Sequence, residues 1–74
     1  MTYATNGWRA AWALASVANH SDLTGVSDED MPTQISDLLC NLCHLMKEED
    51  VDPEAAFQMA FINFNAECDE EDAA

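Results

Sequence analysis

The chain has 74 residues and a formal net charge of −13, because 15 acidic side chains stand against only two basic ones, Arg9 and Lys47. This imbalance excludes nucleic acid and anionic lipid as favourable partners and favours cationic surfaces. A chain of this length forms one domain, 1–74, and its apolar half is rich in alanine, leucine and aromatic residues, which favours a helical fold over disorder.

The first predicted helix covers residues 7–19, with Asn6 as its N-cap. Trp8 and Trp12 lie four residues apart and therefore share one face of this helix. We expect the two indole rings to be core residues rather than a ligand cage. Gly25 and the small polar residues around it predict a connecting loop over 20–27.

The second predicted helix covers residues 31–49, with Pro32 tolerated in its first turn. Its apolar residues recur at steps of three and four, the spacing of one helical face. This stripe, the clearest pattern in the chain, consists of Ile35, Leu38, Leu39, Leu42, Leu45 and Met46.

The third predicted helix covers residues 53–68, with Asp52 as N-cap and Pro53 at the first helical position. One apolar face is expected, made of Phe57, Ala60, Phe61, Phe64 and Cys68. An acidic, frayed tail is expected over 69–74. The short connection between the second and third helices predicts an antiparallel αα-hairpin. The fold prediction is therefore all-α, a small three-helix bundle.

Residues 40–44 read C-x-x-C-H, the spacing of covalent haem attachment. We reject haem, because such attachment belongs to exported proteins and no signal peptide is recognisable here. A zinc site formed by Cys40, Cys43 and His44, completed by Cys68 or a carboxylate, is an alternative for these residues, although the chain has no second cysteine pair. The odd number of cysteines favours reduced thiols, and we expect a cytoplasmic location in a bacterial cell.

Two further metal patterns are incomplete. A calcium loop starting at Asp50 fails because Ala55 replaces the turn glycine and Phe61 replaces the bidentate glutamate. The glutamate pair before Asp50, together with Asp52, is similar to the acidic magnesium motif of all-α nucleotide pyrophosphohydrolases, but the second helix ends among these residues. We therefore expect no metal, no cofactor and no enzymatic activity.

The positions of the acids separate two groups. Acids at helix starts are explained by the helix dipole, whereas acids at helix ends oppose it. Acids of the second kind follow Lys47 and Ala66, and we predict that they form a partner-binding surface. The predicted contact residues are Glu48, Glu49, Asp50, Glu67, Asp69, Glu70 and Glu71.

Part of the chain, residues 35–68, resembles a family of short, mostly uncharacterised bacterial and phage proteins. The resemblance rests on a D-L-L…L-x-H helix followed by a helix that ends in aromatic-x-A-E. The matching residues are Asp37, Leu38, Leu39, Leu42 and His44, then Asp52, Ala56, Ala60, Phe64 and Glu67. The resemblance implies a pair of packed helices and no particular activity. In size and acidity the chain is also similar to anti-CRISPR and antirestriction proteins of phages and mobile elements.

Two functions follow as hypotheses. The first is a non-enzymatic acidic inhibitor, encoded by a phage or mobile element, that mimics DNA and occupies the basic nucleic-acid-binding groove of a host defence or nucleic-acid-processing protein. The second is a helical interaction module or homodimer that uses apolar faces. Under this second hypothesis the acidity reflects a halophilic host.

Overall fold

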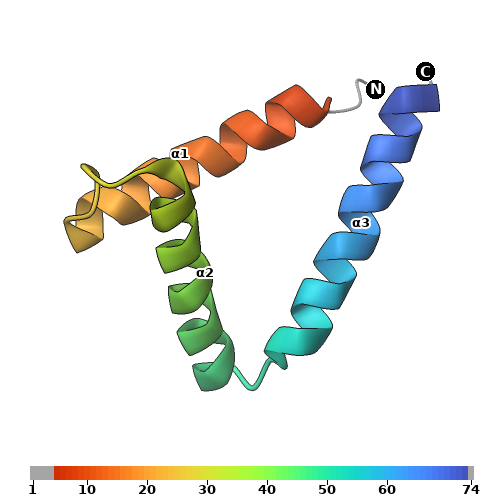
Figure 1. Ribbon diagram of the computed structural model, residues 1–74. Coiled ribbons are helices and arrows are strands. Elements are labelled where there is room, and N and C mark those ends of the chain that lie inside the picture. Colours follow the sequence, from red (N-terminus) through yellow and green to blue (C-terminus); the bar gives the residue numbers. More distant parts are fainter. Residues whose placement is uncertain (1–4, 74) are drawn as a thin grey trace.

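A computed structural model describes residues 5–73 of the chain. Three α-helices and no strand are found in this range: α1 (Asn6–Thr24), α2 (Met31–Glu48) and α3 (Pro53–Ala73) (Figure 1). The predicted all-α class with three helices is confirmed. None of the described helices combines the length and the apolarity that a membrane crossing requires.

Helix α1 begins one residue earlier and ends five residues later than predicted. Thr5, not Asn6, is the N-cap, because its hydroxyl accepts the backbone N–H of Trp8 at 3.2 Å. The predicted loop over 20–27 is helical up to Thr24. Gly25 ends the helix in the left-handed region, with φ of 78°, and its N–H donates to the Ser21 carbonyl at 2.9 Å.

Helix α2 matches its prediction to within one residue. Asp30 is its N-cap and accepts the backbone N–H of Thr33 at 3.0 Å. At the other end Asp50 adopts a left-handed φ of 56°, and the N–H of Val51 donates to the Met46 carbonyl at 2.8 Å. This bond pattern is a Schellman cap, here built without glycine.

Helix α3 continues through the segment predicted to fray. Residues 69–73 are helical, whereas Ala74 lies outside the described residues. The added turns are held by α1, because the backbone N–H of Asn6 donates to the Glu71 carboxylate at 2.7 Å. A carboxylate at a helix N-terminus also meets the positive end of the dipole.

The three helices form the sides of an open triangle (Figure 1). Each pair of helices meets near one vertex only, and α2 and α3 diverge from their connecting turn. The predicted antiparallel hairpin of α2 and α3 is therefore not confirmed. The apolar periodicity of the sequence predicted where the helices lie along the chain, but it did not predict how they pack against one another.

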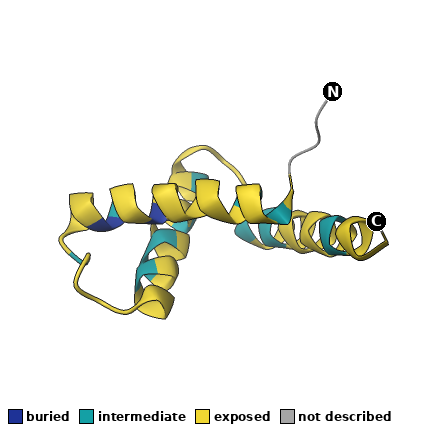
Figure 2. Cartoon of the chain, turned by 90° about the horizontal axis from the view of Figure 1, so that it is seen from above, coloured by how far each residue is buried: buried dark blue, intermediate teal, exposed yellow. Residues whose placement is uncertain are grey.

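The chain is expanded for its length. Its Cα radius of gyration is 14.3 Å, whereas a compact chain of 74 residues has about 11 Å. Its accessible surface is 6013 Å², against about 4,500 Å² for a compact monomer of 8.2 kDa. Among the described residues only Val17 and Ser21 are buried, both on the side of α1 that meets α2 (Figure 2).

Candidate interaction surfaces

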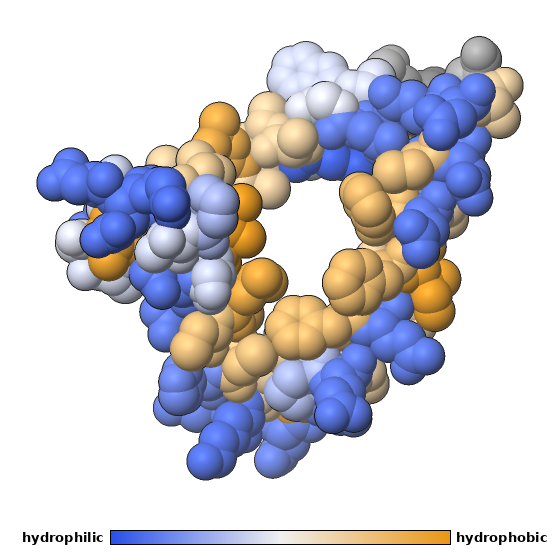
Figure 3. Space-filling view, in the orientation of Figure 1, coloured by the Kyte–Doolittle hydropathy of each residue, from blue (hydrophilic) through white to orange (hydrophobic). Residues whose placement is uncertain are grey.

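The most prominent surface feature is an apolar lining around the opening that the three helices enclose (Figure 3). Most of the leucine stripe of α2 and of the aromatic face of α3 remains open to solvent, whereas Leu38, Met46 and Phe57 are half-buried. Phe61, for example, keeps 65% of its surface exposed. We call this the inner face, and define it by Ile35, Leu39, Leu42 and Leu45 of α2 with Phe57, Phe61 and Phe64 of α3.

The inner face continues into a groove between α1 and α2. This groove has a volume of about 610 Å³ and a lining that is almost wholly apolar, with Leu14 and Val17 on α1 facing Ile35 and Leu38 on α2. Alanines at 10 and 13 let the two helices approach here. The stripe of α2 thus packs against α1 along its first half only.

A second apolar surface lies on the opposite side of α3. At 100° per residue, Met59 and Ile62 project away from the phenylalanine face, and Ile62 keeps 55% of its surface exposed. Residues 55–66 contain no charged side chain at all. A helix that is apolar on two sides is typical of one buried on both sides. The sequence prediction missed this second face, although the uncharged run was a visible signal.

The tryptophans of α1 form a third exposed apolar site. Trp8 is 62% exposed and Trp12 is 58% exposed. Their expected place in a core is wrong for the single chain, because α1 packs on α2 through its opposite side, around Val17 and Ser21.

Acidic side chains gather at the three vertices and leave the middles of the helices nearly free of charge. The turn over 25–30, the turn over 49–52 and the end of α3 hold most of the 15 carboxylates. The predicted contact residues divide between the second and third of these vertices. They are separated by at least about 20 Å along α3, at 1.5 Å per residue. They do not make one continuous row.

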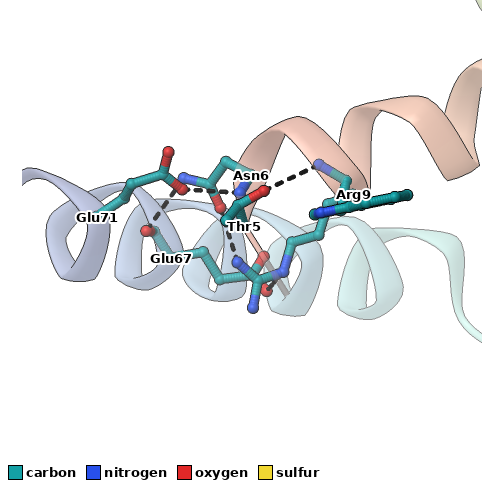
Figure 4. A network of polar contacts seen from close by, with 6 residues as sticks. Thr5, Asn6, Arg9, Glu67 and Glu71 are labelled. Carbon is teal, nitrogen blue, oxygen red and sulfur yellow. Dashed lines mark hydrogen bonds and ion pairs between the residues drawn. The ribbon is translucent and has the colours of Figure 1, made fainter. Parts of the chain in front are cut away.

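Two of these predicted contact residues have partners within the chain (Figure 4). The Glu67 carboxylate lies 2.7 Å from Nε of Arg9, and the Glu71 carboxylate accepts the backbone N–H of Asn6. Asn6 also donates its side-chain amide to the Glu67 carbonyl at 3.2 Å and accepts from Arg9 at 2.8 Å. Glu67 and Glu71 therefore hold α1 against α3.

The other five predicted contact residues form no ion pair within the described chain. They are Glu48, Glu49, Asp50, Asp69 and Glu70. All five are exposed. Their role in binding a partner stays a prediction, now restricted to carboxylates that the fold itself does not use.

The cysteines do not converge on one site. Cys40, Cys43 and His44 line an open pocket of about 660 Å³ beside the turn between α2 and α3. Cys68 lies at another vertex, in a pocket with Arg9 and Phe64. Within residues 5–73 no group of three or more histidine, cysteine or acidic side chains has the geometry to hold a metal ion.

The function of the chain has to be inferred from its own surfaces, because it has no recognised relative. No protein-family model, curated protein or solved structure matches the chain. The inner face and the acidic vertices are two chemically distinct surfaces on one small molecule.

Proposed function

We propose that this protein acts by binding other polypeptides, without a reaction of its own, and that its inner face is the principal contact. The observation that carries the proposal is the exposure of this face, which joins α2 and α3 into one apolar surface around the opening. Soluble monomers rarely expose contiguous apolar patches of more than a few hundred Å². A covering polypeptide would give the leucines and phenylalanines the buried environment that the single chain does not supply.

A photo-crosslinking amino acid at position 61 tests this proposal. p-Benzoylphenylalanine replaces Phe61 with a similar aromatic side chain, and the variant is irradiated in the cells that express it. We expect a covalent adduct with a polypeptide. The matched control carries the same group at His44, which is exposed and, at 100° per residue, lies on the side of α2 opposite the leucine stripe, and should give no adduct. Adducts from neither position, or from both equally, would contradict the proposal.

The acidic vertices support a second candidate function, that of an inhibitor of the anti-CRISPR or antirestriction type. The supporting observation is the set of five exposed carboxylates that have no ion-pair partner in the described chain. Such carboxylates match a basic groove built for nucleic acid, in a host defence or nucleic-acid-processing protein. Because they lie at two vertices, they would contact the groove at separate points rather than as a continuous DNA-like row.

Charge reversal tests this second candidate. Replacing Glu48, Glu49 and Asp50 with lysine should abolish binding to a basic, DNA-binding target while leaving the helical content unchanged. The control replaces the same residues with glutamine, glutamine and asparagine and should weaken binding only in part. Binding should also weaken steeply as salt rises. Binding that resists both charge reversal and salt would overturn the inhibitor model. If the acids instead reflect a halophilic host, the protein should be more stable at high salt than at low salt.

A further inference from the structure

We infer that the inner face is covered by a second copy of this chain, so that two triangles interlock into a homodimer with α3 at its centre. This inference rests on the proposed function, since it names the polypeptide that the inner face binds. Three observations support it: the spatial extent of the chain, the area it leaves exposed and the two-sided apolar character of α3.

The extent of the chain is that of a protein twice its length. A compact protein of 148 residues has a radius of gyration of about 14.7 Å, whereas one of 74 residues has about 11 Å. The observed value is 14.3 Å. One copy thus spans the volume of a compact dimer but fills only half of it. A second copy has the size needed to fill the rest.

The exposed area gives the same result. A compact protein of twice 8.2 kDa exposes about 7,500 Å², whereas two separate copies at 6013 Å² each expose far more. Closing this gap buries about 4,500 Å² in total. Obligate homodimers bury roughly 2,000–5,000 Å² or more, and their interfaces resemble a domain core cut in half. The inner face, which is apolar and divided between two helices, has that character.

Helix α3 has the pattern of an element packed on both sides. An apolar face of α3 lines the opening (Figure 3). At 100° per residue, Phe57, Phe61 and Phe64 share one face of α3, while Met59 and Ile62 project from the opposite side. In the inferred dimer, α3 of one copy contacts the inner face of the partner copy. A twofold axis makes the reverse contact identical, because both copies then use the same surfaces. The span 55–66 has no charge. Its burial therefore leaves no unpaired carboxylate in the interface.

The charge distribution permits this contact despite a net charge of −13 on each copy. The acids lie at the vertices, whereas the inner face and the middle of α3 hold none. The carboxylates of the two copies therefore repel each other only at long range, and salt screens this repulsion beyond about 8–10 Å at moderate ionic strength. The dimer should accordingly be tighter at high salt, the opposite of the salt response expected for the acidic surface bound to a basic groove.

Sedimentation of the wild-type protein over a wide concentration range is the direct test. We expect a mass of twice 8.2 kDa, with a compact shape and slow amide hydrogen exchange across 55–66. A mass of 8.2 kDa at all concentrations, in low and high salt, would overturn the dimer. Because this measurement uses the unmodified chain, the folding of a variant does not limit it.

Two substitutions and a matched control then locate the interface. Phe61→Glu places a charge on the inner side of α3, and Ile62→Glu places one on its other side. Both should shift the protein to the monomer, by at least about tenfold in dissociation constant, as expected for burial of an unpaired charge. Gln58→Glu adds the same charge on a polar strip of the same helix and should leave the dimer intact. Equal behaviour of the three variants would contradict the placement of α3.

Small-angle scattering separates failure of the dimer from failure of the proposed function. A monomer with a radius of gyration near 14.3 Å that binds a hydrophobic dye would refute only the second copy, since the inner face would remain available. A monomer that closes to about 11 Å and binds no dye would refute both, because the inner face would then be an internal core.

Discussion

Arg9 and Glu67 form the ion pair that closes the third vertex of the triangle, with Nε of Arg9 lying 2.7 Å from the Glu67 carboxylate. The two residues come from the first turns of α1 and the last turns of α3 (Figure 4). Their side chains are only about a third exposed, at 34% and 35%. Arg9, one of the two basic residues in the chain, thus holds α1 against α3.

Loss of this ion pair should weaken the fold slightly. Arg9→Gln removes the charge but keeps a hydrogen-bonding side chain, and we expect the free energy of unfolding to fall by about 0.5–1 kcal/mol. Urea unfolding followed by circular dichroism measures this change. The control is a double-mutant cycle with Glu67→Gln. Additive effects of the two substitutions would show that the pair itself contributes nothing.

The last turns of α3 depend on the contact between Glu71 and Asn6. Glu71→Gln removes a negative charge from the N-terminus of α1, where it accepts a backbone N–H at 2.7 Å. The expected loss is about 0.3–1 kcal/mol, concentrated in local opening of residues 69–73. Amide hydrogen exchange by NMR should show faster exchange there and little change in α2. Glu70→Gln is the matched control, because the Glu70 side chain is exposed and forms no hydrogen bond or ion pair within residues 5–73. Equal effects from the two substitutions would rule out a specific anchor.

Local signals in the sequence predicted α2 and the start of α3, where the stabilising interactions are themselves local. Both ends of α1 were misplaced, although the interactions of Thr5 and Gly25 that set them are also local. The leucine stripe lies within α2 itself, and the predicted cap Asp52 accepts the backbone N–H of Glu54 in the turn that it starts. Helix α2 was therefore predicted to within one residue. The prediction erred at the end of α3, because those turns are held by Asn6, 65 residues away in sequence.

The candidate surfaces were predictable only in part for the same reason. The acids are readable from composition, but the use of Glu67 and Glu71 as anchors depends on where α1 begins in space. The apolar stripes of α2 and α3 were readable as helix faces. Their packing against each other could not be predicted from the sequence. A stripe of leucines indicates that a helix face is buried, but not which helix, or which chain, covers it. Trp8 and Trp12 show this directly, since both are typical core residues and both are exposed.

Asp30 should make stability depend on pH near the acid limit. Hydrogen bonds from the Thr33 side chain and then from its backbone N–H hold the pKa of Asp30 below its ordinary value of 3.8. A carboxyl group whose pKa is lower in the folded state stabilises the fold above the unfolded pKa, and this contribution is lost as the pH falls through the folded pKa. Wild type should therefore be more stable than Asp30→Ala at neutral pH, and the difference should shrink below about pH 4.

Thermal unfolding of the two proteins across this pH range measures the difference directly. The other carboxylates titrate in both proteins, so their contribution largely cancels. Asp30→Asn separates charge from capping, because asparagine also caps helices but does not titrate. Its difference from Asp30→Ala should not change with pH. A gap between wild type and Asp30→Ala that is constant from neutral pH to about pH 3 would contradict the role assigned to the ionised cap.

The turn between α2 and α3 should be stabilised by glycine at position 50. Asp50 adopts a φ of 56°, a left-handed conformation that costs L-residues about 1–2 kcal/mol and glycine almost nothing. Part of that gain is lost because glycine increases the freedom of the unfolded chain. We expect Asp50→Gly to raise the free energy of unfolding by about 0.5 kcal/mol, measured by urea unfolding at constant salt. Asp50→Asn is the control, since asparagine tolerates this conformation as aspartate does but carries no charge beside Glu48 and Glu49. Equal stabilisation by glycine and asparagine would assign the gain to relief of charge repulsion rather than to the backbone.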